Sequence, residues 1–574
     1  MKKPARMNLD LLRKGLLILV LMSTLGGCVP LTPPVPPAEE PSEDKTSREA
    51  AYHYSVGIFL ALDGKTDEAI RELETAMGYD PYAPAITLEL APLYLEKGNP
   101  DKAIALCDKT LLRHPDDIDV NLLSGGLYLH VQDTKNALRR YRRIIELDAV
   151  NETAHLYLGT IYADSHRYDK AEEHFRKLLE INPEHPMGNY YLARVQTDMG
   201  LFTEAEAGFR KTLALKPLWE AVLLDLGGLY ERQRRTDLAI QLYRDFLATY
   251  PNRITVRLRL GQLYLREQNY GEAEQAFTTI LGQDRSHQEA RLALGIVYLE
   301  KDRPDQAIEL FLALLVERPE DAKLTYLLAS AYEEKADFPK ALEEYRRVPV
   351  SSDYFGNARI RIGMILSRQG QKDAAVASIR EALALNVALP ALYLYLSQLH
   401  EEQKNLQAAE DCLTEGLRLS PESTDLYYRR GVLYEKTNRF EAGIQAMEQV
   451  LKIDPNHAEA LNFIGYSYAD RGIHLKEAER MIRRALKISP GSGFIIDSLG
   501  WLYFRQNKLD LAVKYLKEAA ELLPGDATVA EHLGDAYVKA GRFREALEAY
   551  ARALELTPDS ASLKKKIQDL QKKK

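Results

Sequence analysis

Residues 220–253, EAVLLDLGGLYERQRRTDLAIQLYRDFLATYPNR, contain the pattern that decides the fold. Large apolar residues recur at intervals of three and four in both halves, which predicts two amphipathic helices. Gly227 in the first half and Ala239 in the second are small enough to let two helix backbones approach closely. Pro251 follows the second apolar run and cannot continue a helix, because it lacks a backbone N–H. The stretch therefore predicts a helical hairpin that closes on Gly227 and Ala239.

The same pattern recurs along the chain with a period of 34 residues, which is the signature of a repeat protein. One residue is inserted near Gly472, and the period then resumes. The first small position is occupied by Gly57, Ala91, Gly125, Gly159, Ala193, Gly227, Gly261, Gly295, Ala329, Gly363, Ser397, Gly431, Gly465, Gly500 and Gly534. The second, twelve residues later or thirteen in the repeat with the insertion, is alanine in every repeat but one, where Gly443 stands. These positions predict about fifteen helical hairpins between about residues 50 and 560.

Tyrosine three residues after the first small position, and proline at the end of the second helix, recur in most repeats. With the two small positions, this pattern resembles the tetratricopeptide-repeat (TPR) family over about nine-tenths of the chain. The resemblance implies an all-α TPR solenoid, a right-handed superhelix of about fifteen helix-turn-helix repeats with a C-terminal capping helix. We assign repeats 1–9 to residues 50–355, repeats 10–15 to residues 356–560 and a basic cap or tail to residues 561–574.

One joint of the array departs from the pattern. Pro349 interrupts the second helix of its repeat early, and Tyr354 and Phe355 follow. We therefore predict a kink or a softened joint near residues 349–356.

The N-terminus has the features of an export signal. Several lysines and arginines precede the apolar run of residues 15–22, which is too short to span a bilayer comfortably but has the length of a signal-peptide core. Residues 25–28, LGGC, then resemble the lipobox of bacterial lipoproteins, in which Cys28 is acylated and becomes the first mature residue. Residues 1–27 are thus predicted to be a lipoprotein signal peptide, with an uncleaved membrane anchor as the alternative.

Residues 28–49 are predicted to hold the lipidated cysteine and a proline-rich linker. Six prolines lie between residues 30 and 41, a composition that favours extended polyproline II and forms no core. At about 3.1 Å per residue, such a tether holds the folded body roughly 50 Å from the lipid. By the sorting habit of the lipoprotein family, Val29 in place of aspartate after Cys28 implies an outer-membrane location that faces the periplasm.

Composition and motifs argue against catalysis, cofactor binding and nucleic-acid binding. The net charge is -8 although the first residues are basic, and we expect no binding to nucleic acid. Cys107 and Cys412 fall within helical patterns, as small buried apolar residues do. No zinc, phosphate-loop, dinucleotide or catalytic motif occurs in the sequence. We expect no enzymatic activity, no metal, no cofactor and no small-molecule substrate.

Function is therefore expected on the concave surface. In the TPR family, positions 2, 5, 9, 12 and 13 of each repeat face this surface, and the lysine and asparagine of a chaperone-tail clamp are missing from them here. The most unusual groove lies near the C-terminus, where two aromatic residues stand beside an amide and a carboxylate. We predict a protein-binding hot spot there, formed by Asn462, Tyr466, Asp497, Trp501, Phe504 and Arg505. The alternative is that Tyr466 and Trp501 only pack against neighbouring helices.

Residues 340–555 also resemble exported TPR proteins and TPR lipoproteins of proteobacteria. The leading hypothesis is a membrane-anchored scaffold for protein or peptide partners in envelope biogenesis, such as the assembly of outer-membrane, secretion, pilus or polymer-export machinery. The alternative is an accessory protein that binds glycan or peptidoglycan, with Tyr466 and Trp501 stacking on sugars.

Overall fold

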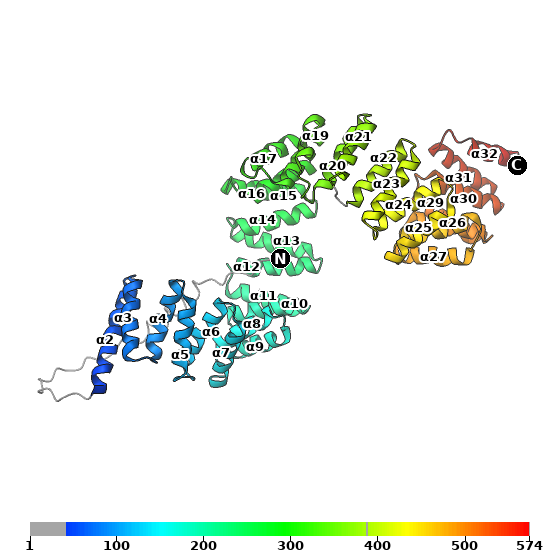
Figure 1. The fold of residues 1–574 in the computed structure, drawn as a ribbon. Coiled ribbons are helices and arrows are strands. Elements are labelled where there is room, and N and C mark those ends of the chain that lie inside the picture. The colour runs from blue at the N-terminus through cyan, green and yellow to red at the C-terminus, as the bar shows by residue number, and fades with distance from the viewer. Residues whose placement is uncertain (1–41, 386–388, 573–574) are drawn as a thin grey trace, which may run out of the picture. The chain divides into compact units, whose positions relative to one another are not determined.

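The computed structural model describes residues 42–385 and 389–572, and within these ranges the chain forms 31 helices and no strand (Figure 1). The helices are α2 to α32, and they come as fifteen consecutive pairs, from α2 and α3 to α30 and α31, followed by α32. The predicted all-α repeat array and its C-terminal capping helix are confirmed. Leader residues 1–27, Cys28 and most of the predicted linker lie outside the described residues.

The chain divides into two compact units, one through Phe246 and one from Leu247, with the division inside α13. The first unit contains α2 (Ser42–Leu62), α3 (Thr66–Tyr79), α4 (Pro84–Glu96), α5 (Pro100–Leu111), α6 (Ile118–His130), α7 (Thr134–Leu147), α8 (Glu152–Asp164), α9 (Tyr168–Ile181), α10 (Pro186–Asp198), α11 (Phe202–Leu215), α12 (Glu220–Arg232) and the larger part of α13 (Thr236–Thr249).

The second unit begins within α13. It contains α14 (Ile254–Arg266), α15 (Tyr270–Gln283), α16 (Gln288–Glu300), α17 (Pro304–Glu317), α18 (Ala322–Glu334), α19 (Phe338–Arg347), α20 (Phe355–Arg368), α21 (Lys372–Leu383), α22 (Pro390–Glu402), α23 (Leu406–Leu419), α24 (Thr424–Lys436), α25 (Phe440–Ile453), α26 (Ala458–Arg471), α27 (Leu475–Ile488), α28 (Gly493–Arg505), α29 (Leu509–Leu522), α30 (Ala527–Lys539), α31 (Phe543–Leu556) and α32 (Ala561–Gln571). The assignment of repeats 1–9 and 10–15 to separate segments stays a prediction.

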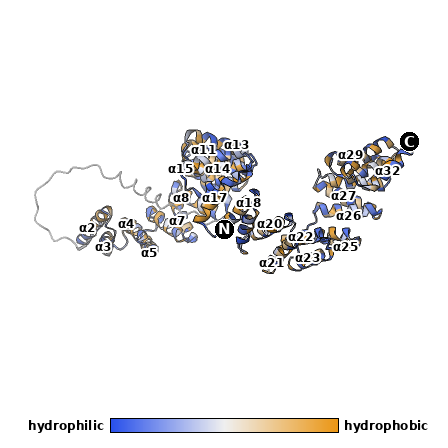
Figure 2. Ribbon diagram, turned by 90° about the horizontal axis from the view of Figure 1, so that it is seen from above, coloured by the Kyte–Doolittle hydropathy of each residue, from blue (hydrophilic) through white to orange (hydrophobic). Residues whose placement is uncertain are grey.

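Within each unit, the helices pack against their neighbours in the sequence. Hydrophobic and hydrophilic residues mix on every helix, as expected for helices that bury one side (Figure 2). The small residues predicted to close each hairpin are buried: Ala239, Ala273 and Ala307, for example, have no exposed surface. Aromatic rings of the second helix lie opposite several of the glycines. A Cβ atom on Gly159 would lie 2.5 Å from the Phe175 ring, and one on Gly227 would collide with the Tyr243 hydroxyl.

The N-terminal boundary differs from the prediction in one respect. Helix α2 begins at Ser42, so residues 42–49 of the predicted linker are helical. The reason is local, because Pro41 is the last proline of the segment and Ser-Glu-Asp follows, a sequence that favours a helix start. No helix in the described ranges has the length and apolar character needed to cross a membrane.

The joint near residues 349–356 is a shortened helix followed by a packed turn. Helix α19 has 10 residues, against 14 for most second helices, and it ends at Arg347 as the early proline predicts. Val348 and Phe355 on either side of the turn are each only 1% exposed. These apolar side chains are buried where the last helical turn would otherwise lie. The kink or softened joint predicted near residues 349–356 stays a prediction.

The α12–α13 hairpin offers a matched test of this packing. We expect Gly227→Ala to lower the free energy of unfolding by about 1–3 kcal/mol, because the added methyl group overpacks against Tyr243. A methyl group on the neighbouring Gly228, in the same helix, would meet no heavy atom within 4 Å, so Gly228→Ala should stabilise by about 0.5–1 kcal/mol. Hydrogen exchange of the α12 and α13 amides measures both. Equal effects at the two positions would contradict a close approach at Gly227.

Two histidines form a polar contact inside the first unit. His155 of α8 is 1% exposed; its Nδ1 lies 3.1 Å from Nδ1 of His174 on α9, and its Nε2 lies 3.1 Å from the Ala149 carbonyl oxygen. Burial, with the nearby His155 as a second cause, lowers the pKa of His174 to about 4. His174 is therefore neutral in the folded protein at physiological pH.

This contact makes the stability of the first unit depend on pH. Because the pKa of His174 is lower in the folded chain, its stabilising contribution is complete above pH 6.5 and is lost as the pH falls toward 4. We expect α8 and α9 to lose roughly 1–3 kcal/mol of protection over this range. Hydrogen exchange at several pH values measures the loss, and His174→Gln should flatten it. An unchanged pH profile in that variant would contradict the assignment to His174.

Candidate functional site

The residues predicted to bind a partner lie on two neighbouring first helices. Asn462 and Tyr466 belong to α26, and Asp497, Trp501, Phe504 and Arg505 belong to α28. Their spacing of three, four or seven residues places them on one face of each helix. The structure brings Tyr466, Asp497, Trp501 and Phe504 together around His532 of α30, which the sequence analysis did not include.

Trp501 is packed rather than open. Its ring is 8% exposed and stacks on His532 at a centroid distance of 4.1 Å and on Phe504 at 4.7 Å. The indole Nε1 donates a hydrogen bond of 3.1 Å to Asp470 of α26. These contacts join three successive repeats, so packing between helices, the alternative interpretation, accounts for the position of Trp501.

Asp497 and His532 form a buried polar contact beside the indole. Asp497 is 7% exposed and His532 is 8% exposed, and His532 Nδ1 lies 3.1 Å from both carboxylate oxygens. The half-buried Tyr466 faces the same imidazole at 6.4 Å. Burial, with Asp470, Asp497 and Glu435 as further causes, raises the pKa of Tyr466. The cluster is therefore a polar core element shared by α26, α28 and α30.

The remaining predicted residues lie at the rim of this cluster. Asn462 is half-buried, and its side-chain oxygen has no hydrogen-bond partner within the described residues. Phe504 is half-buried beneath the Lys539 ammonium, which lies 4.6 Å from the ring centroid. Arg505 is exposed. A partner that binds here can contact Arg505 and Lys539 directly but reaches little of Trp501, and binding by these residues stays a prediction.

Carboxylates near the C-terminal ends of two first helices form ion pairs with arginine and lysine side chains of the next repeat. Glu401 of α22 contacts Arg429 at 2.7 Å and Lys436 at 2.8 Å, both on α24. Glu333 of α18 lies 3.5 Å from Arg361 of α20, and both carboxylates have side chains that are 8% exposed. An acidic residue in a last helical turn is unfavourable beside the helix dipole, and these cations offset that cost. The contacts tie neighbouring repeats together along this helix face.

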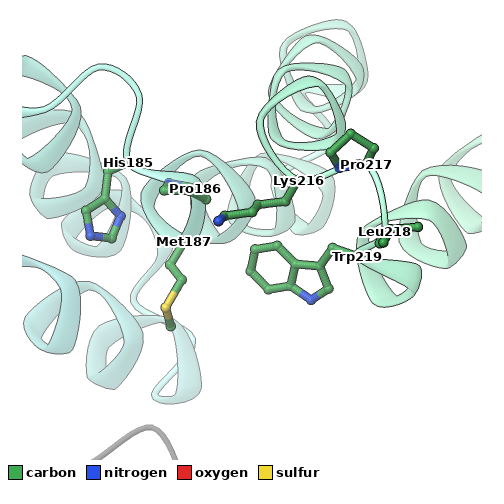
Figure 3. Close-up of a pocket in the computed structure, with 7 residues that line it drawn as sticks. All are labelled: His185, Pro186, Met187, Lys216, Pro217, Leu218 and Trp219. Atoms are coloured by element: carbon green, nitrogen blue, oxygen red, sulfur yellow. The ribbon is translucent and has the colours of Figure 1, made fainter. Parts of the chain in front are cut away.

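The first unit has an open apolar pocket that the sequence analysis missed. It has a volume of about 630 Å³ and lies between the loops that precede α10 and α12 (Figure 3). In Figure 3 the Trp219 indole lies beside the Lys216 side chain, with Pro186 and Met187 across the pocket. Leu218 at the rim is 51% exposed. This volume is in the range of ligand pockets and suits one or two apolar side chains of a partner.

Polar and aromatic groups continue from the pocket onto α10 and α12. The Trp219 ring lies 4.9 Å from the ring of Tyr190, whose hydroxyl donates a hydrogen bond of 2.9 Å to Asp225. The Arg194 guanidinium lies 5.7 Å from the same tyrosine ring and 3.9 Å from Asp225. Burial and the Asp225 carboxylate raise the pKa of Tyr190. Tryptophan, tyrosine and arginine are the residue types that dominate binding energy at protein interfaces.

The position of Trp219 in its repeat is the sequence feature that could have indicated the pocket. Trp219 is the N-cap residue of α12, and its side chain makes no capping hydrogen bond. Most equivalent positions carry a residue whose side chain caps its helix: Asp117, Asn151, His185, His287, Asp321, Ser423, His457, Asp526 and Ser560. Loss of a cap costs about 1 kcal/mol. A large aromatic residue in its place suggests a role other than folding.

Family models for the tetratricopeptide repeat match residues 60–125, 152–185, 219–263, 258–322, 292–354, 360–424, 424–457 and 498–561. Together these matches span well over half of the chain. The chain belongs to the tetratricopeptide-repeat family. Proteins of this family bind protein partners.

Individual relatives match less of the chain. It is 31% identical to the TPR repeat-containing protein PA4667 of Pseudomonas aeruginosa over 186 residues, which cover 32% of this chain and 31% of that protein. Among solved structures, it is similar to yeast Tom70, with 18% identity, a TM-score of 0.34 and coverage of 73% of this chain and 93% of that one. It is also similar to Naa15/Naa10 bound to HypK-THB, with 14% identity, a TM-score of 0.34 and coverage of 91% and 96%.

The Asp497–His532 contact supports a stability prediction for the second unit. We expect His532→Ala to lower its free energy of unfolding by about 2–4 kcal/mol, because the change leaves the Asp497 carboxylate buried without its partner and removes the stack on Trp501. The double variant with Asp497→Ser should recover part of the loss. Urea denaturation followed by hydrogen exchange of α28 and α30 measures both. Additive losses would show that the two side chains do not interact.

Proposed function

We propose that this TPR protein is a lipid-anchored scaffold in bacterial envelope biogenesis, held at the outer membrane through Cys28 and facing the periplasm. The LGGC motif at residues 25–28 and the proline-rich segment after it support the anchor. The family supports protein partners, and the pocket at Trp219 is the single observation that carries the choice of binding site. The machinery it serves is of the outer-membrane, secretion, pilus or polymer-export kind.

The lining of the pocket at Trp219 indicates which kind of side chain a protein partner inserts there. Its lining is apolar apart from the Lys216 amine and the His185 imidazole, so an apolar side chain of the partner enters it. Beside the pocket, Arg194 and Asp225 offer a cation and a carboxylate at the surface. Both have side chains more than 40% exposed and pay little desolvation when a partner binds. A protein segment with an apolar anchor and flanking polar groups fits this surface best.

The sugar-binding alternative has less support. Stacking on a sugar requires an open aromatic face, and Trp501 is 8% exposed with its ring against His532 and Phe504. Tyr466 is half-buried near the same imidazole. We therefore propose protein as the partner class.

Crosslinking in intact cells, with mass spectrometry of the captured proteins, tests this function. We compare the natural chain with Cys28→Ala, which removes the proposed anchor, and with Leu218→Ser, which makes the pocket rim polar. Both variants should lose the same envelope proteins, and Leu218→Ser should weaken binding about tenfold, because burial of a leucine side chain contributes about 1.5–3 kcal/mol. Leu218 is 51% exposed, so its replacement should leave the fold intact.

The matched control is Val316→Ser, which changes an apolar residue in the second unit that is 84% exposed. It should leave the captured set unchanged. If Leu218→Ser and Val316→Ser behave alike, the pocket is not the binding site, although the scaffold function survives. If the natural chain captures no envelope protein, the proposed function is wrong.

A further inference from the structure

The loop that forms one wall of the pocket departs from the repeat at two positions. Lys216 is the C-cap residue of α11. At the same position of other repeats, Asp148, Asp284 and Asp454 each accept a hydrogen bond of 2.9 to 3.2 Å from the backbone N–H two residues further on. A lysine ammonium only donates hydrogen bonds, so Lys216 cannot close its loop in this way. The N-cap residue Trp219 likewise makes no capping hydrogen bond, and both residues line the pocket.

Another repeat shows the partner that Lys216 lacks. Arg318, the C-cap residue of α17, occupies the position of Lys216 and lies 3.4 Å from Asp321, the N-cap residue of α18. Trp219 occupies the position of Asp321. Among the residues that the structure describes, Lys216 forms no ion pair. Its charge is therefore available to a ligand in the pocket.

The carboxylates near the pocket are paired with other groups. Asp225 lies 3.9 Å from Arg194. Glu152 accepts a hydrogen bond of 3.0 Å from the side-chain amide of Asn182. Glu220, the first residue of α12, also has a partner. None of the three carboxylates lines the pocket. The pocket wall therefore carries a lysine ammonium and no carboxylate, which favours an anionic group in the ligand.

The ammonium lies where it meets a ligand that fills the pocket. In Figure 3 the Lys216 side chain points toward Pro186 and lies beside the Trp219 indole. An apolar group between these walls displaces water from around the ammonium, and a contact between opposite charges strengthens as water is displaced. Helix α12 begins at the same edge of the pocket, and the N–H groups of its first turn add a partial positive charge.

We propose that the pocket binds an extended, acidic segment of a protein partner. An apolar side chain of the segment enters beside Trp219, and an aspartate or glutamate two residues away pairs with Lys216. In an extended segment, side chains two residues apart lie on the same side and about 7 Å from each other, a distance that the long lysine side chain spans. Lysine acts as a point charge, so either acidic residue serves. This inference rests on the proposed function, because it specifies the partner of the same site.

Titration of the full chain with two synthetic peptides tests the acidic segment. The peptide GSDSFSDSG places an aspartate two residues from a phenylalanine on both sides, and GSNSFSNSG replaces both aspartates by asparagine; both have blocked ends. Trp219 emission reports binding, since the other tryptophan, Trp501, is 8% exposed and lies in the second unit. We expect the acidic peptide to bind about fivefold tighter at low ionic strength, because hydrogen bonds to charged groups are stronger than neutral ones. Salt should reduce this preference.

Variants of two exposed lysines assign the preference. Lys216→Gln should bind the two peptides equally, with the affinity that the natural chain has for the asparagine peptide, and Lys216→Glu should prefer the asparagine peptide. The matched control is Lys211→Gln, which changes an exposed lysine of α11 that does not line the pocket. It should keep the fivefold ratio. Thermal unfolding of each variant shows whether the fold is retained.

Three outcomes would overturn the proposal. Equal affinity of the natural chain for the two peptides would show that the pocket does not select an acidic segment. A preference that persists in Lys216→Gln would assign it to another cation. If neither peptide saturates the Trp219 signal, the pocket does not bind this segment, and saturation by decanoate would then assign it to a lipid. Capture of envelope proteins in cells does not depend on the peptide ratio, so failure of this proposal and failure of the proposed function are distinguishable.

Discussion

The structure depends on the close approach of two helices at one small residue in each repeat. Gly125 faces the Tyr141 ring, Gly159 faces Phe175 and Gly295 faces Phe311, each at a distance that leaves no room for a methyl group. The ring of the second helix fills the space that the missing side chain of the first leaves open. Close packing of this kind fixes the angle and separation of the two helices, and a repeated angle generates an array.

A second consequence is that, within each unit, packing follows the order of the helices in the sequence. Neighbouring helices of a unit pack on one another, so stability accumulates from repeat to repeat, and helix faces remain free along each unit. Ionic contacts such as Glu401 with Arg429 and Lys436 reinforce the joints between repeats. The features that distinguish this chain from a generic array are therefore local departures: the early end of α19 and the aromatic residue at the N-cap of α12.

The candidate sites show where sequence reasoning succeeds and where it stops. The sequence predicted that Tyr466 and Trp501 share one face of adjacent first helices, because that face follows from the repeat phase, and both side chains lie near His532. It did not reveal that His532, one repeat further, would cover the indole. Burial of a side chain at such a position depends on the size of residues 31 to 35 positions away, and no local pattern reports it. The sequence analysis did not identify Trp219, because it considered only helix positions that face the groove, and Trp219 lies at the N-cap of α12.

The sequence by itself determined the helical hairpins, their number, their phase and the capping helix, because the period of 34 residues repeats the same steric requirement fifteen times. It also supplied the only indication of an anchor, at Cys28. The tertiary structure decided which groove residues are covered and which loops open into a pocket. These properties arise from contacts between side chains of different repeats, and such contacts depend on the three-dimensional stacking of the repeats and not on any one repeat alone.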